Sequence, residues 1–142
     1  MRELPRQLSV DELAALFEGR TRFVERLAAL DDPLGRAREV GAALSDDEKK
    51  EVLDAHPAIG ASKLSARSAR EQGASEAPPE LLELNRAYDE KFGFRFVVFV
   101  NRRPKAELVP ILRERLGRTR AQELSTALDE LVSIALDRWR RG

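Results

Sequence analysis

Apolar side chains recur at helical spacing along most of this chain, and this periodicity limits its possible folds more than any other feature. Near the C-terminus, Leu124, Leu128, Leu131 and Ala135 follow one another at intervals of three or four residues. That spacing places side chains on one face of an α-helix. Helices with one apolar face bury it by packing against each other. The pattern therefore predicts an all-α fold of about six to eight helices.

Local capping signals indicate where several of these helices begin. The sequences SVDE at 9–12 and SDDE at 45–48 both match the capping box, in which a serine and a glutamate three residues apart satisfy the first free amides. The sequence DDP at 31–33 predicts a further start, with proline at the first helical position. We expect other helices over about 79–91, 106–116 and 119–140. Pro110 should kink the second of these or mark its true start.

Residues 92–100, FGFRFVVFV, are the exception to the helical pattern. They contain four of the six phenylalanines together with β-branched residues, and they show no helical period. Such a run is typical of a buried extended segment, but one strand alone cannot form a sheet. We therefore expect a short irregular or extended aromatic segment near 94–100 within an otherwise helical protein.

Composition narrows the possible functions. The chain has 25 basic and 25 acidic residues, so it offers no overall basic charge for nucleic acid or an anionic membrane. It has no cysteine and only one histidine, which excludes thiol catalysis and leaves few ligands for a transition metal. No run approaches the about 20 apolar residues of a membrane span, and the N-terminus lacks a signal-peptide pattern. We expect one soluble cytoplasmic domain over 1–142.

The only histidine, His56, lies where a predicted helix meets a proline. A residue before proline avoids the α region, so Pro57 should stop the helix and direct the imidazole off its end, outside the core. One interpretation is a cap that interacts with the helix dipole. The other is a proton-transfer group, because an imidazole has an ordinary pKa near neutrality. Pattern alone favours the cap.

Other polar residues stand where apolar ones are expected. Arg138 borders the apolar stripe of the last helix, either extending its head to water or holding a carboxylate in a pocket. Asn85 shares the inward face of its helix with Tyr88, which favours a structural hydrogen bond over ligand contact. Ser68, Glu71 and Gln72 share one face of a short predicted helix, a pattern typical of a solvated surface.

Taken in order, HPAIG, SAREQ, LNRAYDEKFGFRFVVFVNRRP, RERLGRTRAQEL and ALDELVSIALDRW resemble the signature blocks of the OHCU decarboxylases, over residues 56–139. Members of that family act on 2-oxo-4-hydroxy-4-carboxy-5-ureidoimidazoline (OHCU), an intermediate of urate breakdown. The resemblance implies an all-α homodimer that needs no cofactor and gives (S)-allantoin. The chain departs from the family pattern at Ala58, where Asp is frequent, and at Arg95, where proline is common.

The resemblance also implies roles for individual residues. His56 and Glu71 match catalytic positions, and the substrate-binding positions match Pro57, Ser68, Gln72, Phe96, Val97, Val98, Val100 and Arg138. Asn85 and Tyr88 remain structural polar residues. The expected partner is a small anionic ureidoimidazoline, with neither nucleic acid nor membrane. Two alternatives stay open at this point, namely a hydrolase of a ureido or cyclic amide bond and a helical interaction module without catalysis.

Overall fold

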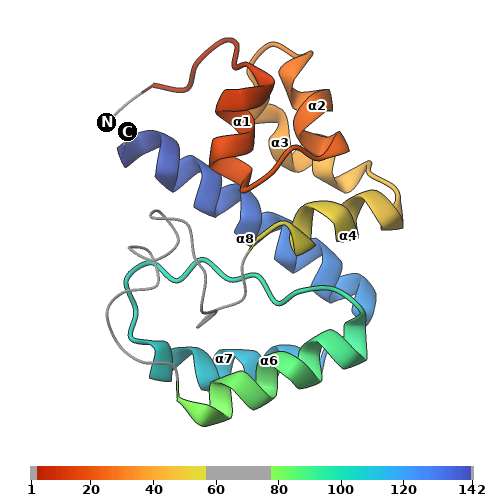
Figure 1. Ribbon diagram of the computed structural model, residues 1–142, viewed down its shortest axis with the longest axis vertical. Helices are drawn as coiled ribbons and strands as arrows, with labels where there is room; N and C mark the ends of the chain where they lie inside the picture. The colour runs from red at the N-terminus through yellow and green to blue at the C-terminus, as the bar shows by residue number, and fades with distance from the viewer. Residues whose placement is uncertain (1–2, 57–77, 142) are drawn as a thin grey trace.

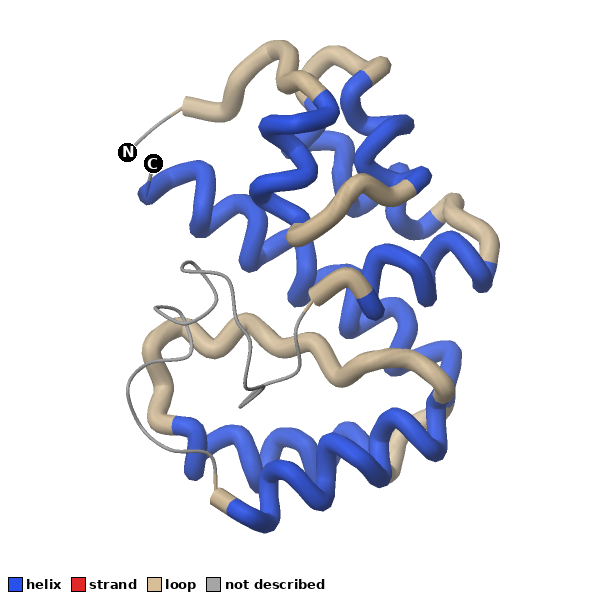
Figure 2. The backbone as a smooth tube through the Cα atoms, viewed as in Figure 1, coloured by secondary structure: helices blue, strands red, loops and turns tan. Residues whose placement is uncertain are grey.

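The computed structural model describes residues 3–56 and 78–141. These residues form seven α-helices and one short 3-10 helix, and no strand occurs among them (Figure 2). This confirms the predicted all-α class. The elements are α1 Val10–Phe17, α2 Arg22–Ala28, α3 Pro33–Ala42, α4 Asp46–Asp54, α6 Pro79–Phe92, η1 Lys105–Glu107, α7 Leu108–Leu116 and α8 Arg120–Arg141.

The long helix α8 organises the molecule. In Figure 1 it runs diagonally through the structure, with α1, α2 and α3 above it and α6 and α7 below it. Helices α1, α3 and α4 all pack directly on α8, while α6 packs on α7. No helix of the described ranges is long and apolar enough to cross a membrane. Helix α8 thus provides the surface on which α1, α3 and α4 pack, while α6 and α7 pack on each other below it (Figure 1).

The starts of α1, α3 and α4 are those predicted from local chemistry. The hydroxyl of Ser9 accepts from the Glu12 amide at 3.1 Å, and the Glu12 carboxylate accepts from the Ser9 amide at 3.1 Å. The same reciprocal pair forms at the start of α4, and Asp32 caps α3 with proline in its first turn. Pro110 lies in the first turn of α7, where its missing N–H has no helical partner to lose. It therefore marks the start of the helix.

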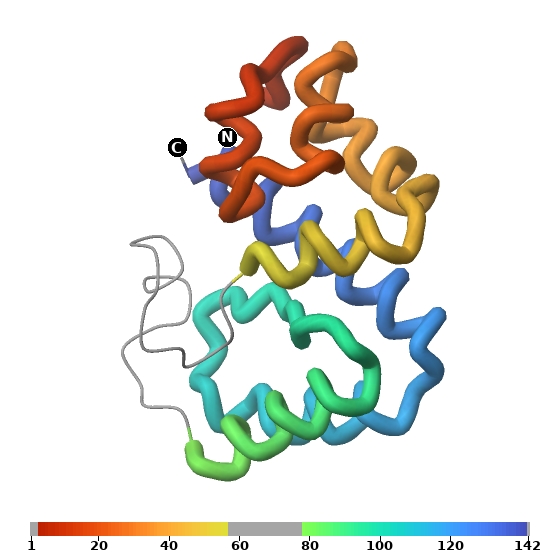
Figure 3. Tube along the Cα trace, turned by 45° about the vertical axis from the view of Figure 1, so that its right-hand side comes forward, coloured from red at the N-terminus to blue at the C-terminus, as the bar shows by residue number. Residues whose placement is uncertain are grey.

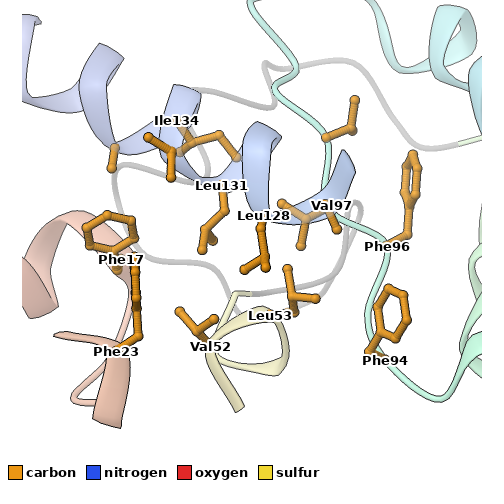
Figure 4. Packing of buried hydrophobic residues seen from close by; sticks show 14 of the residues in the cluster. Phe17, Phe23, Val52, Leu53, Phe94, Phe96, Val97, Leu128, Leu131 and Ile134 are labelled. Carbon is orange, nitrogen blue, oxygen red and sulfur yellow. The ribbon is translucent and has the colours of Figure 1, made fainter. Parts of the chain in front are cut away.

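Residues 95–100 form the irregular buried segment that the sequence predicts. The segment lies between α4 and the pair α6 and α7 in both views (Figures 1 and 3). Its side chains alternate in direction. Phe96 contacts the Tyr88 ring of α6 with 5.2 Å between ring centroids, whereas Val97 points toward Leu53 and Leu128 (Figure 4). The segment therefore connects the cores on its two sides without forming a sheet.

Candidate functional site

His56 follows the last turn of α4 and is buried. The helix ends at Asp54, and the His56 amide donates to the Leu53 carbonyl at 3.2 Å. Only 5% of His56 is exposed. The expectation that its imidazole lies outside the core is therefore wrong. The reason is tertiary packing: the end of α4 lies against α8 and the 95–100 segment, and Leu53 next to it is fully buried.

The surroundings of His56 keep its imidazole neutral at pH 7. The pKa of His56 is lowered from 6.5 to about 3, and burial is the largest cause. The positive charges of Arg138 and Arg95 contribute to this lowering, while the carboxylate of Glu18 opposes it. The Nε2 atom of His56 is buried and has no hydrogen-bond partner among the described residues. Because buried polar atoms nearly always have a partner, this atom is a candidate contact for a ligand.

Arg138 lies within the protein, close enough to His56 to influence its titration. Its side chain is 2% exposed, so the alternative in which its head reaches water is wrong. One Nη atom donates to the Leu16 carbonyl at 3.0 Å, and the other donates to a Glu18 carboxylate oxygen at 3.0 Å. These contacts hold the Arg138 guanidinium at the C-terminal end of α1, near His56.

Glu18 contributes to the site and was missed by the sequence reasoning. It ends α1 in the left-handed conformation, with φ 64° and ψ 20°, although it is followed by Gly19, which adopts that region more easily. A non-glycine residue in this region costs about 1–3 kcal/mol of strain. In this conformation the Glu18 side chain forms the ion pair with Arg138. A glutamate directly before a glycine at a helix end is the only signal in the sequence.

The predicted pocket segment is fixed by Arg115 of α7 and by Arg103, which follows the segment in the chain. Phe96, Val97, Val98 and Val100 are all buried, with exposed fractions of 2–5%. The Val97 carbonyl accepts from Arg115 Nη1 at 2.8 Å, and the Val100 carbonyl accepts from Arg103 Nε at 3.0 Å. The backbone of this irregular segment is therefore held by side chains, since no neighbouring strand pairs with it in the described structure.

A buried network continues from Arg115 to α8 and α6. Glu123 is fully buried and accepts from Arg115 Nε at 2.7 Å and from the Tyr88 hydroxyl at 2.6 Å. Burial and this bond raise the pKa of Tyr88 well above its usual value, so the hydroxyl stays a donor. Tyr88 is buried within this network, and Asn85 on the same helix is half-buried. Arg115 and Glu123 were missed, although both fall on apolar stripes of their helices.

Part of the expected site lies outside the described residues. Pro57, Ser68, Glu71 and Gln72 belong to this part, as does the family departure at Ala58. Among the positions that the structure describes, it brings His56 and Arg138 close enough for their charges to interact, and it places the 95–100 segment next to the end of α4. No group of three metal-ligating side chains occurs within 3–56 and 78–141.

Comparison with known proteins decides the family. The sequence model described as OHCU decarboxylase matches residues 2–140, nearly the whole chain. This chain belongs to the OHCU decarboxylase family. A 2-oxo-4-hydroxy-4-carboxy-5-ureidoimidazoline decarboxylase of Haloferax volcanii is 28% identical over 141 residues, which cover 89% of this chain and 83% of that protein.

Two further similarities support membership in the OHCU decarboxylase family. The uric acid degradation bifunctional protein of Bacillus sp. (strain TB-90) is 33% identical over 108 residues, covering 70% of this chain but only 22% of that protein. The chain thus spans less than a quarter of the length of this relative. A crystal structure of OHCU decarboxylase in the presence of (S)-allantoin superimposes with a TM-score of 0.75 at 26% identity, covering 90% of this chain and 94% of the other.

Proposed function

We propose that this chain catalyses the decarboxylation of OHCU to (S)-allantoin in urate degradation, without a cofactor. The observation that carries the proposal is the buried, neutral imidazole of His56, with an unpartnered Nε2, beside the buried guanidinium of Arg138. The family match over 2–140 supports the substrate, as does the similarity to a decarboxylase crystallised with (S)-allantoin. A base next to a fixed positive charge suits an anionic substrate that must exchange protons.

The reaction requires one bond to break and one proton to be placed. The bond between the ring carbon and the carboxylate breaks, carbon dioxide leaves, and the electron pair stays delocalised on the imidazoline ring. A proton from solvent then takes the place of the lost carboxylate in the overall balance. Delivery of a proton to ring carbon from one face would give a single enantiomer. The protein must therefore hold the ring in one orientation and supply a proton carrier on one side.

His56 is the proposed proton carrier. Because its pKa is about 3, the imidazole is neutral at pH 7 and begins the cycle as a base. It accepts the proton of the substrate hydroxyl and returns a proton to the ring after carbon dioxide has left. General acid–base catalysis of this kind typically contributes about 10²–10⁴-fold to the rate. We assign the second catalytic role to Glu71, on the strength of the family resemblance.

Arg138 is the proposed anchor for the substrate anion. Its ion pair with Glu18 and its bond to the Leu16 carbonyl fix the guanidinium before substrate arrives. A hydrogen bond to a charged group is worth about 1.5–3 kcal/mol. The remaining substrate contacts are assigned to Pro57, Ser68 and Gln72 and to the segment formed by Phe96, Val97, Val98 and Val100. Groups held in place in this way stabilise charge without reorganising during the reaction.

Two further assignments rest on length and composition, and a third rests on the family resemblance. We propose that 1–142 is one domain, that the protein acts in the cytoplasm, and that it forms a homodimer. The family match over 2–140 supports the first of these. Light scattering coupled to size-exclusion chromatography tests the last, since a homodimer has twice the 16.0 kDa mass of the chain. A mass of one chain at assay concentration would contradict it.

The variant His56→Ala tests the proposed function. We expect it to fold, because the imidazole Nε2 makes no hydrogen bond within the described structure, and to lose most of its turnover of freshly generated OHCU. Carbon dioxide release and allantoin formation are both measured, because hydrolysis of a ureido bond would not give allantoin. Circular dichroism confirms folding. Turnover at the parent rate by the folded variant would refute the role of His56.

A further inference from the structure

Arg95 connects the irregular segment to the end of α4. Its backbone amide donates to an Asp54 carboxylate oxygen at 3.0 Å, and its Nη1 donates to the Asp54 carbonyl at 3.0 Å. The same Nη1 also donates to the carbonyl of His56. We propose that Arg95 is a positioning residue that fixes the backbone of His56 and thereby the direction of its imidazole. This inference deepens the proposed function and rests on it for the catalytic consequence.

The side chain of Arg95 donates to carbonyl groups at the C-terminal end of α4. The last carbonyls of an α-helix have no partner within the helix, and a basic side chain can satisfy them. Here the guanidinium bonds to residues on both sides of Ala55, so it holds the turn through which the chain leaves α4. The imidazole of His56 is attached to that turn. The arginine is 39 residues away in sequence, so the restraint is tertiary.

Two hydrogen bonds therefore fix the backbone of His56, one from a neighbouring turn and one from a residue distant in sequence. The local anchor is the bond from its own amide to the Leu53 carbonyl at 3.2 Å. Arg95 supplies the distant anchor at the carbonyl of the same residue. A displacement of about 1 Å in a reacting group can reduce a rate by about 10²-fold. Loss of the distant anchor should thus reduce catalysis while α4, which is held by its buried Val52 and Leu53, stays folded.

Arg95 also contributes charge at the imidazole. The charged groups that affect His56 are Arg138 and Arg95, which disfavour its protonation, and Glu18, which favours it. Loss of the Arg95 charge should therefore raise the pKa of His56. Since His56 is the only histidine of the chain, its ring signals can be assigned in an NMR spectrum without ambiguity. This readout needs no substrate and differs from a measurement of stability.

The experiment compares Arg95→Met with Arg120→Met. Arg120 is a matched control, because its Nε donates to the Phe92 carbonyl at 3.0 Å at the end of α6, and its other nitrogens pair with Asp46 at the start of α4. We expect kcat of Arg95→Met to fall about 10- to 100-fold with little change in KM. Its His56 ring signals should shift and titrate at higher pH. Arg120→Met should keep the parent kcat and ring signals, and Arg95→Lys should recover part of the pKa change.

Two results would overturn the proposal. One is an Arg95→Met protein with parent kcat and unchanged His56 signals. The other is an equal loss of kcat in Arg95→Met and Arg120→Met, which would reduce Arg95 to a general contribution to stability. If the parent protein does not turn over OHCU, the proposed function fails by itself. In that case, the ring signals of His56 still decide whether Arg95 positions it, because they are recorded without substrate.

Discussion

Replacing Glu123 with glutamine removes the negative charge from a fully buried ion pair. The Glu123 carboxylate accepts from Tyr88, from Arg115 at 2.7 Å and from Arg118 at 3.2 Å. Glutamine has nearly the same shape but presents an amide group that must face one of these donors. The side chain of Arg115, only 6% exposed, would then be a buried charge without its carboxylate.

The burial of this ion pair predicts a large loss of stability for Glu123→Gln. Breaking a buried pair by removing one partner typically costs about 3–5 kcal/mol, whereas an exposed pair contributes about 0–1 kcal/mol. The total stability of a domain of this size is about 5–15 kcal/mol. Since 1 kcal/mol shifts Tm by about 2–4 °C at this length, the melting temperature should fall by about 6–20 °C. Activity should fall as well, because Arg115 also holds the Val97 carbonyl.

Urea unfolding followed by circular dichroism measures the effect, with Glu114→Gln as the control. Glu114 is exposed on α7, next to Arg115 in the sequence, so its substitution makes the same chemical change without burial. The control should unfold close to the parent. If Glu123→Gln lost no more stability than Glu114→Gln, the buried network would contribute no more than a surface ion pair. In that case Glu123 would not anchor the 95–100 segment through Arg115.

Three further predictions concern His56, its neighbour Glu18 and a helix cap. His56 has a pKa of about 3 when folded and about 6.5 when unfolded, so the unfolded chain binds the extra proton between these values and stability falls as pH drops through that window. As the pH is lowered from 7 to 4, the unfolding free energy of the parent should therefore fall relative to that of His56→Gln. A difference between the two proteins that does not change with pH would contradict the burial of His56. Glu18→Gln should lower the pKa of His56 further and reduce stability by about 3 kcal/mol, because buried Arg138 loses its ion pair with the Glu18 carboxylate. An unchanged NMR titration of His56 would exclude this effect of Glu18. Ser9→Ala should reduce stability by about 1 kcal/mol and leave kcat unchanged, since the cap of α1 is exposed and distant in sequence from His56; loss of kcat would show that the start of α1 influences the site.

The helix boundaries could be predicted because they depend on residues close together in sequence. The serine and glutamate of each capping box are three residues apart, and both boxes form as expected. The irregular segment near 94–100 was also predictable, since its aromatic run lacks helical period. The contacts that join this segment to its neighbours could not be predicted, because Arg95 and Arg115 bond to atoms 18–41 residues away in sequence.

His56 and Arg138 could be singled out from the sequence as candidate site residues, but their environment could not be predicted. Arg138 could be identified as a polar residue beside an apolar stripe, and the same reasoning applied to Arg115 and Glu123 would have found the buried network. The burial of His56 could not be derived from its proline neighbour, because it depends on how the end of α4 packs against α8. Glu18 gave no periodic signal, since it lies beyond the end of α1.

The enantiomer of the product tests the central claim most directly. The parent protein is supplied with freshly generated OHCU, and the allantoin formed is analysed by circular dichroism and chiral chromatography while carbon dioxide release is followed. A decarboxylase that protonates the ring from one side should release carbon dioxide faster than the uncatalysed control and give (S)-allantoin alone. Racemic allantoin, formed at the rate of the control without protein, would contradict the account.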